Sequence, residues 1–162
     1  MRENALFQLL VLIFIFMVAF VLEIMPWPAG FQGLRPSWVI LVLIYWALAL
    51  PDKVSVGTAF LAGIVWDLIL GSILGIHALV LSVAIYVVAK YHLILRNLSL
   101  WLQSLLVMAY IALIRFCIFF IELVLHSAEF NTQELLGAVL SGILWPWIFL
   151  LMRHIRRGLH LR

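Results

Sequence analysis

The sequence predicts an all-α, polytopic membrane protein: one integral membrane domain, residues 1–162, folded as a bundle of six transmembrane helices with both termini in the cytoplasm. Hydrophobic residues make up 67% of the 162 residues and charged residues only 10%, whereas soluble domains are roughly 45–50% apolar. A membrane crossing takes about 20 residues, so this length allows six crossings and leaves no room for a soluble catalytic domain. Any function must therefore lie in the spans, their short loops or the tails.

Helix-breaking and charged residues divide the chain into six apolar segments. Prolines end the first two segments, a pair of glycines ends the third, and Lys90 and Arg96 mark the exit of the fourth. The expected spans are residues 5–25, 36–50, 54–71, 76–95, 99–125 and 133–152. The second span is short for a full crossing, which indicates local thinning of the bilayer there. The fifth is the longest, which indicates that it is tilted or projects from the membrane.

The distribution of Lys and Arg residues predicts the orientation. With the N-terminus in the cytoplasm, most cations lie on the cytoplasmic side, Arg35 alone lies outside and Arg115 lies within a span. The cytoplasmic cations are Arg2, Lys53, Lys90, Arg96, Arg153, Arg156, Arg157 and Arg162. This asymmetry favours both termini inside. The basic C-terminal tail, which is expected to follow the sixth span, is predicted to attract anionic lipid, with a cytoplasmic docking site as the alternative.

Three ionisable residues lie where lipid is expected: Asp67, Arg115 and Glu122. A carboxylate at membrane depth costs about 2.5–3.5 kcal/mol on insertion scales, so Asp67 should face a partner group or water inside the bundle. Arg115 and Glu122 are seven residues apart and so share a helix face. Three uses stay open: a structural pair or loop cap within the bundle, a docking site for another membrane protein, and a substrate or proton pathway.

Small residues mark the places where backbones are expected to approach closely or reverse. Four residues recur at every fourth position: Gly63, Asp67, Gly71 and Gly75. A continuous helix would hold them on one narrow stripe suited to helix packing, while the last two glycines also indicate a tight reversal. In the sixth segment, the ring of Pro146 should free the carbonyl of Gly142 and bend the helix.

Motifs for catalysis, metals and nucleic acid are missing from the sequence. The five histidines show no metal-ligand spacing among themselves. The H-E-x-x-H and G-x-S-x-G patterns and a glycine-rich phosphate loop are also absent. The cations are scattered at span ends rather than gathered on one polar face, which argues against a nucleic-acid partner. The sequence therefore predicts a protein that is not an enzyme and holds no metal or cofactor.

Five short segments, taken in order, resemble the MreD family of proteobacterial rod shape-determining proteins. They are Met25-Pro26-Trp27-Pro28; Leu34-Arg35-Pro36-Ser37-Trp38; Ala49-Leu50-Pro51 with Val54-Ser55-Val56-Gly57-Thr58; Asp67-Leu68-Ile69-Leu70-Gly71-Ser72-Ile73-Leu74-Gly75; and Trp145-Pro146-Trp147-Ile148-Phe149-Leu150-Leu151-Met152-Arg153. Each segment is a weak signal alone, but the five in order are specific and span nearly the whole chain.

The resemblance implies a non-catalytic subunit of the bacterial inner membrane, within the machinery that inserts peptidoglycan along the side wall of rod-shaped cells. It implies association with MreC, which has a single span, and through it with the MreB filament and the wall synthases. The family is also similar to the small-molecule-binding membrane subunits of energy-coupling-factor transporters. That likeness gives the alternative: a solute-binding subunit with an outer pocket near Asp67, Arg115 and Glu122.

Overall fold

The computed structural model describes residues 2–125, 129 and 131–161, and all regular secondary structure in these ranges is helical. The elements are α1 (Arg2–Ile24), the 3-10 helix η1 (Gln32–Leu34), α2 (Trp38–Ala49), α3 (Val56–Leu70), α4 (Ile76–Lys90), α5 (His92–Arg96), α6 (Leu100–Leu125) and α7 (Gln133–Gly158). The predicted all-α class is confirmed.

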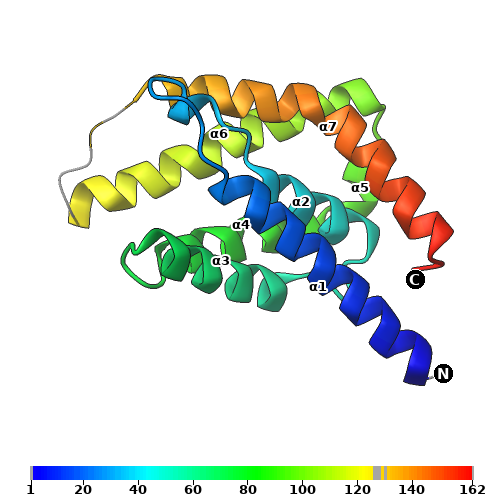
Figure 1. Cartoon of the computed structure of the whole chain (residues 1–162). Helices are drawn as coiled ribbons and strands as arrows, with labels where there is room; N and C mark the ends of the chain where they lie inside the picture. The colour runs from blue at the N-terminus through cyan, green and yellow to red at the C-terminus, as the bar shows by residue number, and fades with distance from the viewer. Residues whose placement is uncertain (1, 126–128, 130, 162) are drawn as a thin grey trace.

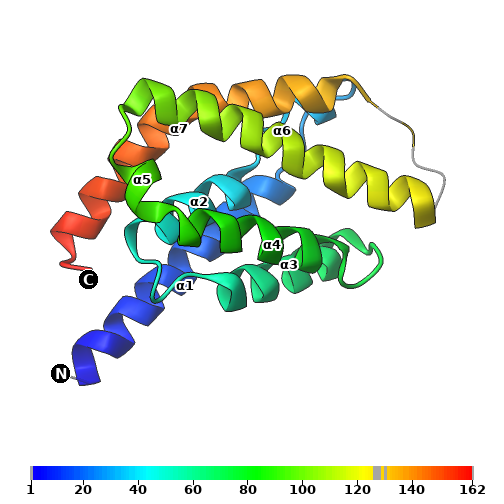
Figure 2. The ribbon, with the colours of Figure 1, turned by 180° about the vertical axis from the view of Figure 1, so that it is seen from behind.

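The longer helices run back and forth between two ends of the molecule (Figures 1 and 2). The N- and C-termini lie at the same end, which we call the terminal end (Figure 1). It also carries the turn between α2 and α3 and the short helix α5. The opposite end, which we call the loop end, carries the loop between α1 and α2 and the turn between α3 and α4.

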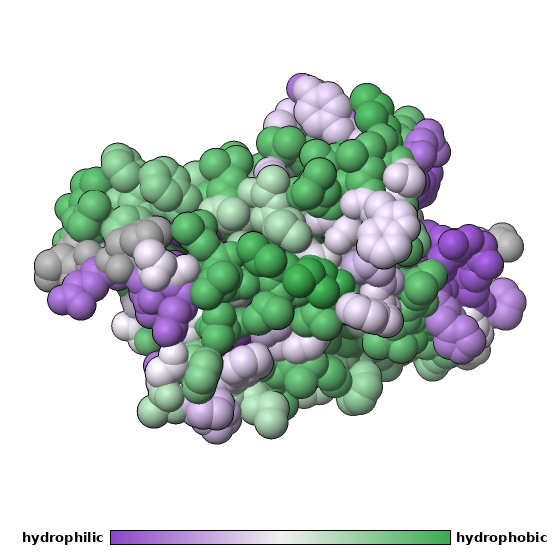
Figure 3. All heavy atoms as spheres, turned by 90° about the horizontal axis from the view of Figure 1, so that it is seen from above, coloured by the Kyte–Doolittle hydropathy of each residue, from purple (hydrophilic) through white to green (hydrophobic). Residues whose placement is uncertain are grey.

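In the part of the chain that the structure describes, four segments are long and apolar enough to cross a membrane: Asn4–Ile24, Gln32–Ala49, Leu100–Leu125 and Gln133–Gly158. The helices α3 and α4 are apolar but shorter, with 15 residues each. Seen from above, apolar side chains cover most of the face between hydrophilic groups at its two ends (Figure 3). The structure therefore has the apolar surface of a membrane protein.

Two predicted spans have different bounds in the structure. The sixth was expected to end at residue 152, but α7 continues to Gly158, so the cations of the expected tail lie on the last turns of a helix. Arginine is a good helix former, so nothing in this stretch stops the helix. The fourth was expected to run without a break to residue 95, but it is divided at Tyr91 into α4 and α5. Arg162, expected at the cytoplasmic side, lies outside the described residues.

Helix α2 forms the centre of the bundle. Every residue from Val39 to Leu48 is buried, and α2 contacts α1, α4, α5 and α7. A helix that is apolar around its whole circumference is expected to be buried in this way. Two hairpins, α3–α4 and α6–α7, pack beside it.

The α3–α4 hairpin depends on two kinds of glycine. A Cβ atom at Gly63 would clash with the backbone of Ala78, so this glycine lets the two helices meet closely. Helix α3 ends at Leu70, and the following Gly71 and Gly75 have φ values of +65° and +107°. These conformations are costly for residues with a side chain. The stripe of small residues is thus limited to α3, and the last two glycines form the reversal.

The α6–α7 hairpin is fitted around Pro146. Helix α7, which contains Pro146, changes direction along its length (Figure 1), and the hydroxyl of Ser104 donates a hydrogen bond to the carbonyl of Gly142. That carbonyl lies four residues before the proline, which has no N–H to bond it. A Cβ atom at Gly142 would clash with Met108 of α6, so the two helices touch closely at the bend.

Candidate functional site

Asp67 lies in the last turn of α3, fully buried, and bonds the turn that follows. Its Oδ1 accepts hydrogen bonds from the Ser72 hydroxyl at 3.0 Å and the His77 backbone N–H at 3.3 Å. Its Oδ2 accepts one from the Gly75 N–H at 2.9 Å. The carboxylate therefore caps the start of α4, where backbone N–H groups have no partner within the helix.

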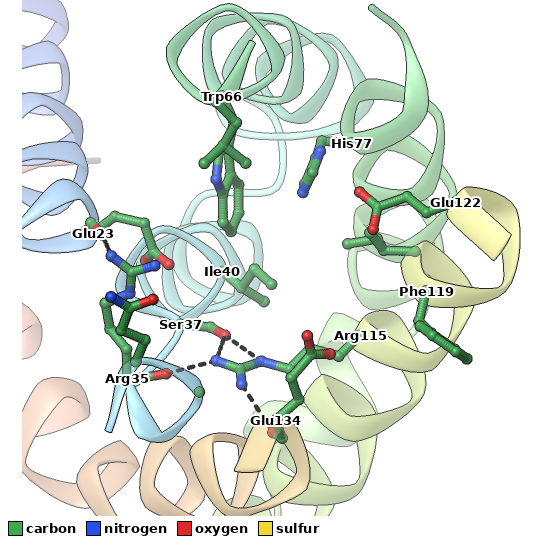
Figure 4. A pocket seen from close by; sticks show the side chains of 14 residues that line it. Glu23, Arg35, Ser37, Ile40, Trp66, His77, Arg115, Phe119, Glu122 and Glu134 are labelled. Atoms are coloured by element: carbon green, nitrogen blue, oxygen red, sulfur yellow. Dashed lines mark hydrogen bonds between the residues drawn. The ribbon is translucent and has the colours of Figure 1, made fainter. Parts of the chain in front are cut away.

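The ring of His77 completes this arrangement. Its Nδ1 lies 2.7 Å from Oδ1 of Asp67, and because an ionised carboxylate can only accept, Nδ1 carries the proton. The imidazole stacks on Trp66, with ring centroids 4.8 Å apart, and both rings line the cavity described below (Figure 4). Asp67 thus acts on the cavity indirectly, by fixing His77.

Arg115 of α6 joins the loop before α2 to the start of α7 (Figure 4). Its Nε and one terminal nitrogen donate to the Ser37 hydroxyl at 3.0 and 2.7 Å. The same terminal nitrogen donates to the carbonyl of Arg35 at 2.7 Å, and the other donates to the carbonyl of Glu134 at 2.8 Å. The guanidinium is therefore held by oxygen atoms without a formal charge, and not by Asp67.

Small residues allow the chain to cross itself tightly around this guanidinium. A Cβ atom at Gly137 would clash with Arg115 and with the carbonyl of Gly33, and one at Gly33 would clash with Gln133. The amide of Gln133 also donates to the carbonyl of Gly30 at 2.7 Å. The loop before α2 is thus held directly against the first turns of α7.

Glu23 and Arg35 form the opposite wall of the site (Figure 4). The Glu23 carboxylate accepts a hydrogen bond from the N–H of Val39 at 3.4 Å, in the first turn of α2. The Arg35 side chain donates to the backbone carbonyl of Glu23 at 2.7 Å. The last turn of α1 is therefore bonded both to α2 and to the loop that precedes it.

These groups surround a cavity of about 220 Å³ at the loop end (Figure 4). Its charged lining consists of three carboxylates, from Glu23, Glu122 and Glu134, and two guanidinium groups, from Arg35 and Arg115. Its volume is below the roughly 300–1,000 Å³ typical of small-molecule pockets. Among the residues that the structure describes, no three His, Cys, Asp or Glu side chains come together as a metal site.

Two of the carboxylates have no partner. Within the described ranges, no hydrogen bond or ion pair reaches the side chain of Glu122 or Glu134. Both are half-buried and line the same cavity. Half-buried carboxylates without a partner are costly, so this side of the cavity suits a cationic or hydrogen-bond-donating group from outside the chain.

The predicted residues are therefore only partly brought together. Arg115 and Glu122 line one cavity, as their shared helix face indicates, whereas Asp67 lies behind His77. Sequence reasoning missed His77, which is ten residues from Asp67 and reaches it across the turn. Sequence reasoning also did not single out Glu23, whose carboxylate is bonded to the start of α2.

Comparisons with known proteins agree on one family. The family model described as "rod shape-determining protein MreD" matches residues 3–155. A curated protein from Haemophilus influenzae named "Rod shape-determining protein MreD" is 57% identical over 161 residues, which cover 99% of each chain. No solved structure matches the chain. On these matches, the chain belongs to the MreD family of rod shape-determining proteins.

Proposed function

We propose that this protein is a non-catalytic inner-membrane subunit of the cell-elongation complex, which builds the peptidoglycan side wall. In this proposal it helps to set rod shape by binding an MreC-like protein with a single span, and so connects MreB and the wall synthases to the membrane. The observation that carries the proposal is membership of the MreD family over residues 3–155.

The proposed topology has six crossings, with the terminal end in the cytoplasm and the loop end outside. The alternation of α1, α2, α3, α4, α6 and α7 between the two ends supports it (Figure 1). So does the gathering of Lys53, Arg96 and the arginines of α7 at the terminal end, because cytoplasmic loops are rich in Lys and Arg. A reporter enzyme that is active only in the periplasm, fused after residue 162, is expected to give no signal, and a positive signal would refute the topology.

The partner is proposed to bind at the loop end, over the cavity that Arg115 and Glu122 line and that Asp67 supports through His77. The lining has one more carboxylate than guanidinium groups, and two of its carboxylates lack a partner among the residues that the structure describes. A partner that brings a Lys or Arg side chain to the outer end of its own span would neutralise this excess. The partner's chemistry is thus a membrane helix followed by a basic residue.

Charge reversal at Glu122 tests this site. The variant Glu122→Arg is expected to reduce co-purification of the MreC-like partner at least fivefold and to round the cells, because it replaces the attraction by repulsion. The matched control is Glu129→Gln, which removes an exposed carboxylate at the same end without touching the cavity. Normal cell shape and full recovery of the partner with Glu122→Arg, in protein that keeps its wild-type helicity, would refute the proposed site.

The basic end of α7 is proposed to lie among anionic lipid headgroups, where each cation near the surface contributes about 1 kcal/mol of attraction. No cofactor, metal or nucleic acid enters the proposal. The alternative of a solute-binding transporter subunit gains no support from a cavity of about 220 Å³.

A further inference from the structure

A second polar cavity lies at the terminal end, away from the site described above. It has a volume of about 250 Å³ and is lined by Tyr45, Leu48, Ala49, Arg96, Phe149, Arg153 and Arg156. The arginines come from α5 and from the last turns of α7, and the other side chains come from α2 and α7. Three segments distant in sequence thus line one cavity, and two of them, α5 and α7, bring three guanidinium groups to it.

No carboxylate of the described residues neutralises the charges of these arginines. No carboxylate of the described residues lies within ion-pair distance of Arg96, Arg153 or Arg156. Arg153 and Arg156 are half-buried, and like charges held together in a partly desolvated site repel one another. A bound anion would remove this repulsion, and arginine is the side chain best suited to phosphate because its N–H groups match the phosphate oxygens.

The lining of this cavity includes the side chain of Tyr45. Tyr45 is only 2% exposed, and its ring packs edge-to-face against Phe149, with centroids 5.4 Å apart. Within the described part of the chain, its hydroxyl has no hydrogen-bond partner. Arg156, Arg153 and Arg157 are all near enough to act electrostatically on this hydroxyl, but only the first two line the cavity. A tyrosine hydroxyl can donate a hydrogen bond, so an anion in the cavity could accept from this hydroxyl and from the arginines together.

An apolar cavity of about 300 Å³ adjoins this basic cavity. Leu48 lines both, and Leu95, next to Arg96 in the chain, lines the apolar one. The remaining apolar lining comes from α2, α4, α5, α6 and α7, including Val87, Leu106 and Val107. A phosphate group with an attached hydrocarbon chain would occupy both cavities together.

We propose that the cavity of Tyr45, Arg96, Arg153 and Arg156 binds a phosphate group, and that its source is the headgroup of an anionic phospholipid whose acyl chain enters the adjoining apolar cavity. This deepens the lipid attraction proposed for the end of α7 and rests on that proposal, since it requires the terminal end to meet a membrane surface. This proposal differs from the earlier one because it assigns the lipid contact to particular residues, whereas the earlier one assigned it to the total charge of the end of α7.

Native mass spectrometry of the full-length protein in detergent, titrated with dioleoyl-phosphatidylglycerol, tests the assignment. The double variant Arg153→Gln/Arg156→Gln is expected to weaken lipid binding at least about tenfold. Tyr45→Phe keeps the ring but removes one hydrogen bond to a charged group, which is worth about tenfold or more in affinity. Circular dichroism of each variant verifies the fold. The binding assay needs neither the MreC-like partner nor a shape phenotype, so failure of the lipid site is distinct from failure of the proposed function.

The matched control is Arg157→Gln, which removes the same charge from the same helix end but lies outside the cavity lining. Less than a twofold loss is expected there, and a loss equal to that of Arg156→Gln would overturn the proposal in favour of diffuse attraction. A second titration, with inorganic phosphate in place of lipid, distinguishes a lipid headgroup from free phosphate as the source of the bound phosphate group. Leu106→Trp, which fills the apolar cavity, is expected to weaken the lipid and leave phosphate unaffected. Wild-type protein that binds neither probe would refute the site.

Discussion

Replacing Asp67 by alanine is expected to lower the free energy of unfolding by about 2–6 kcal/mol. The substitution leaves two backbone N–H groups, of Gly75 and His77, without the acceptor that they now share. Each buried donor left without a partner costs about 1–3 kcal/mol. The Ser72 hydroxyl can rotate toward another acceptor and adds little to this sum.

Asparagine at the same position is expected to cost about half as much. It keeps one acceptor oxygen and turns the other into an amide donor, so only one of the two N–H groups of Gly75 and His77 is left facing a donor. The His77 ring can change tautomer and accept from the new amide. The ratio of the stability losses of Asp67→Ala and Asp67→Asn therefore depends on how many acceptor oxygens each variant keeps, and not on the loss of charge.

Unfolding in mixed micelles of dodecyl maltoside and SDS, followed by far-UV circular dichroism, measures both variants. Ser72→Ala serves as the control, because it removes one hydrogen bond to Asp67 without leaving a backbone group unpaired, and its cost is expected to be at most about 1.5 kcal/mol. Equal losses for Asp67→Ala and Asp67→Asn would refute the acceptor argument and point to the charge. No loss for Asp67→Ala would refute the capping role altogether.

Two further predictions concern the hairpins. Gly63→Leu is expected to lower the free energy of unfolding by at least about 2 kcal/mol in the same assay, because its Cβ would clash with the backbone of α4. The control Gly57→Ala, where the space is open, is expected to be neutral or to raise stability by up to about 1 kcal/mol. Equal losses for the two variants would contradict the packing argument. Ser104→Ala is expected to cost about 1–3 kcal/mol of stability, and less in a Pro146→Ala background, where the restored N–H can bond the Gly142 carbonyl. If a double-mutant cycle of these two substitutions shows no coupling energy, Ser104 does not stabilise that carbonyl.

Much of the fold could be predicted because a bilayer leaves few choices for the backbone. Apolar segments between prolines, glycines and charged residues predict helices, and the helical bounds agree with the expected spans except at the ends of α4 and α7. At those two ends the helix differs from the expected span because the sequence indicates where the apolar stretch stops, not where the helix stops. Arg153, Arg156 and Arg157 continue the helix beyond the apolar part of α7.

The pairing of polar groups was harder to predict. Arg115 is bonded to two backbone carbonyls and one serine hydroxyl, and backbone acceptors leave no mark on a sequence. Asp67 meets a histidine ten residues later because two glycines reverse the chain between them, whereas a search at helical spacing looks only three or four residues away. The glycines at 33 and 137 could have indicated the close crossing near Arg115, but only once these segments were known to be neighbours.

The unequal lengths of the two hairpins have a consequence for the surrounding lipid. Helices α3 and α4, with 15 residues each, rise about 22 Å, whereas α6 and α7, with 26 each, rise about 39 Å. The hydrocarbon layer of a bilayer is about 30 Å thick, so α3 and α4 are shorter than this layer and α6 and α7 are longer. Lipids are therefore expected to compress beside α3–α4 and to stretch or tilt beside α6–α7. Such a gradient in thickness favours a neighbour with a short apolar segment beside α3–α4, so the protein can orient its neighbours before any specific contact forms.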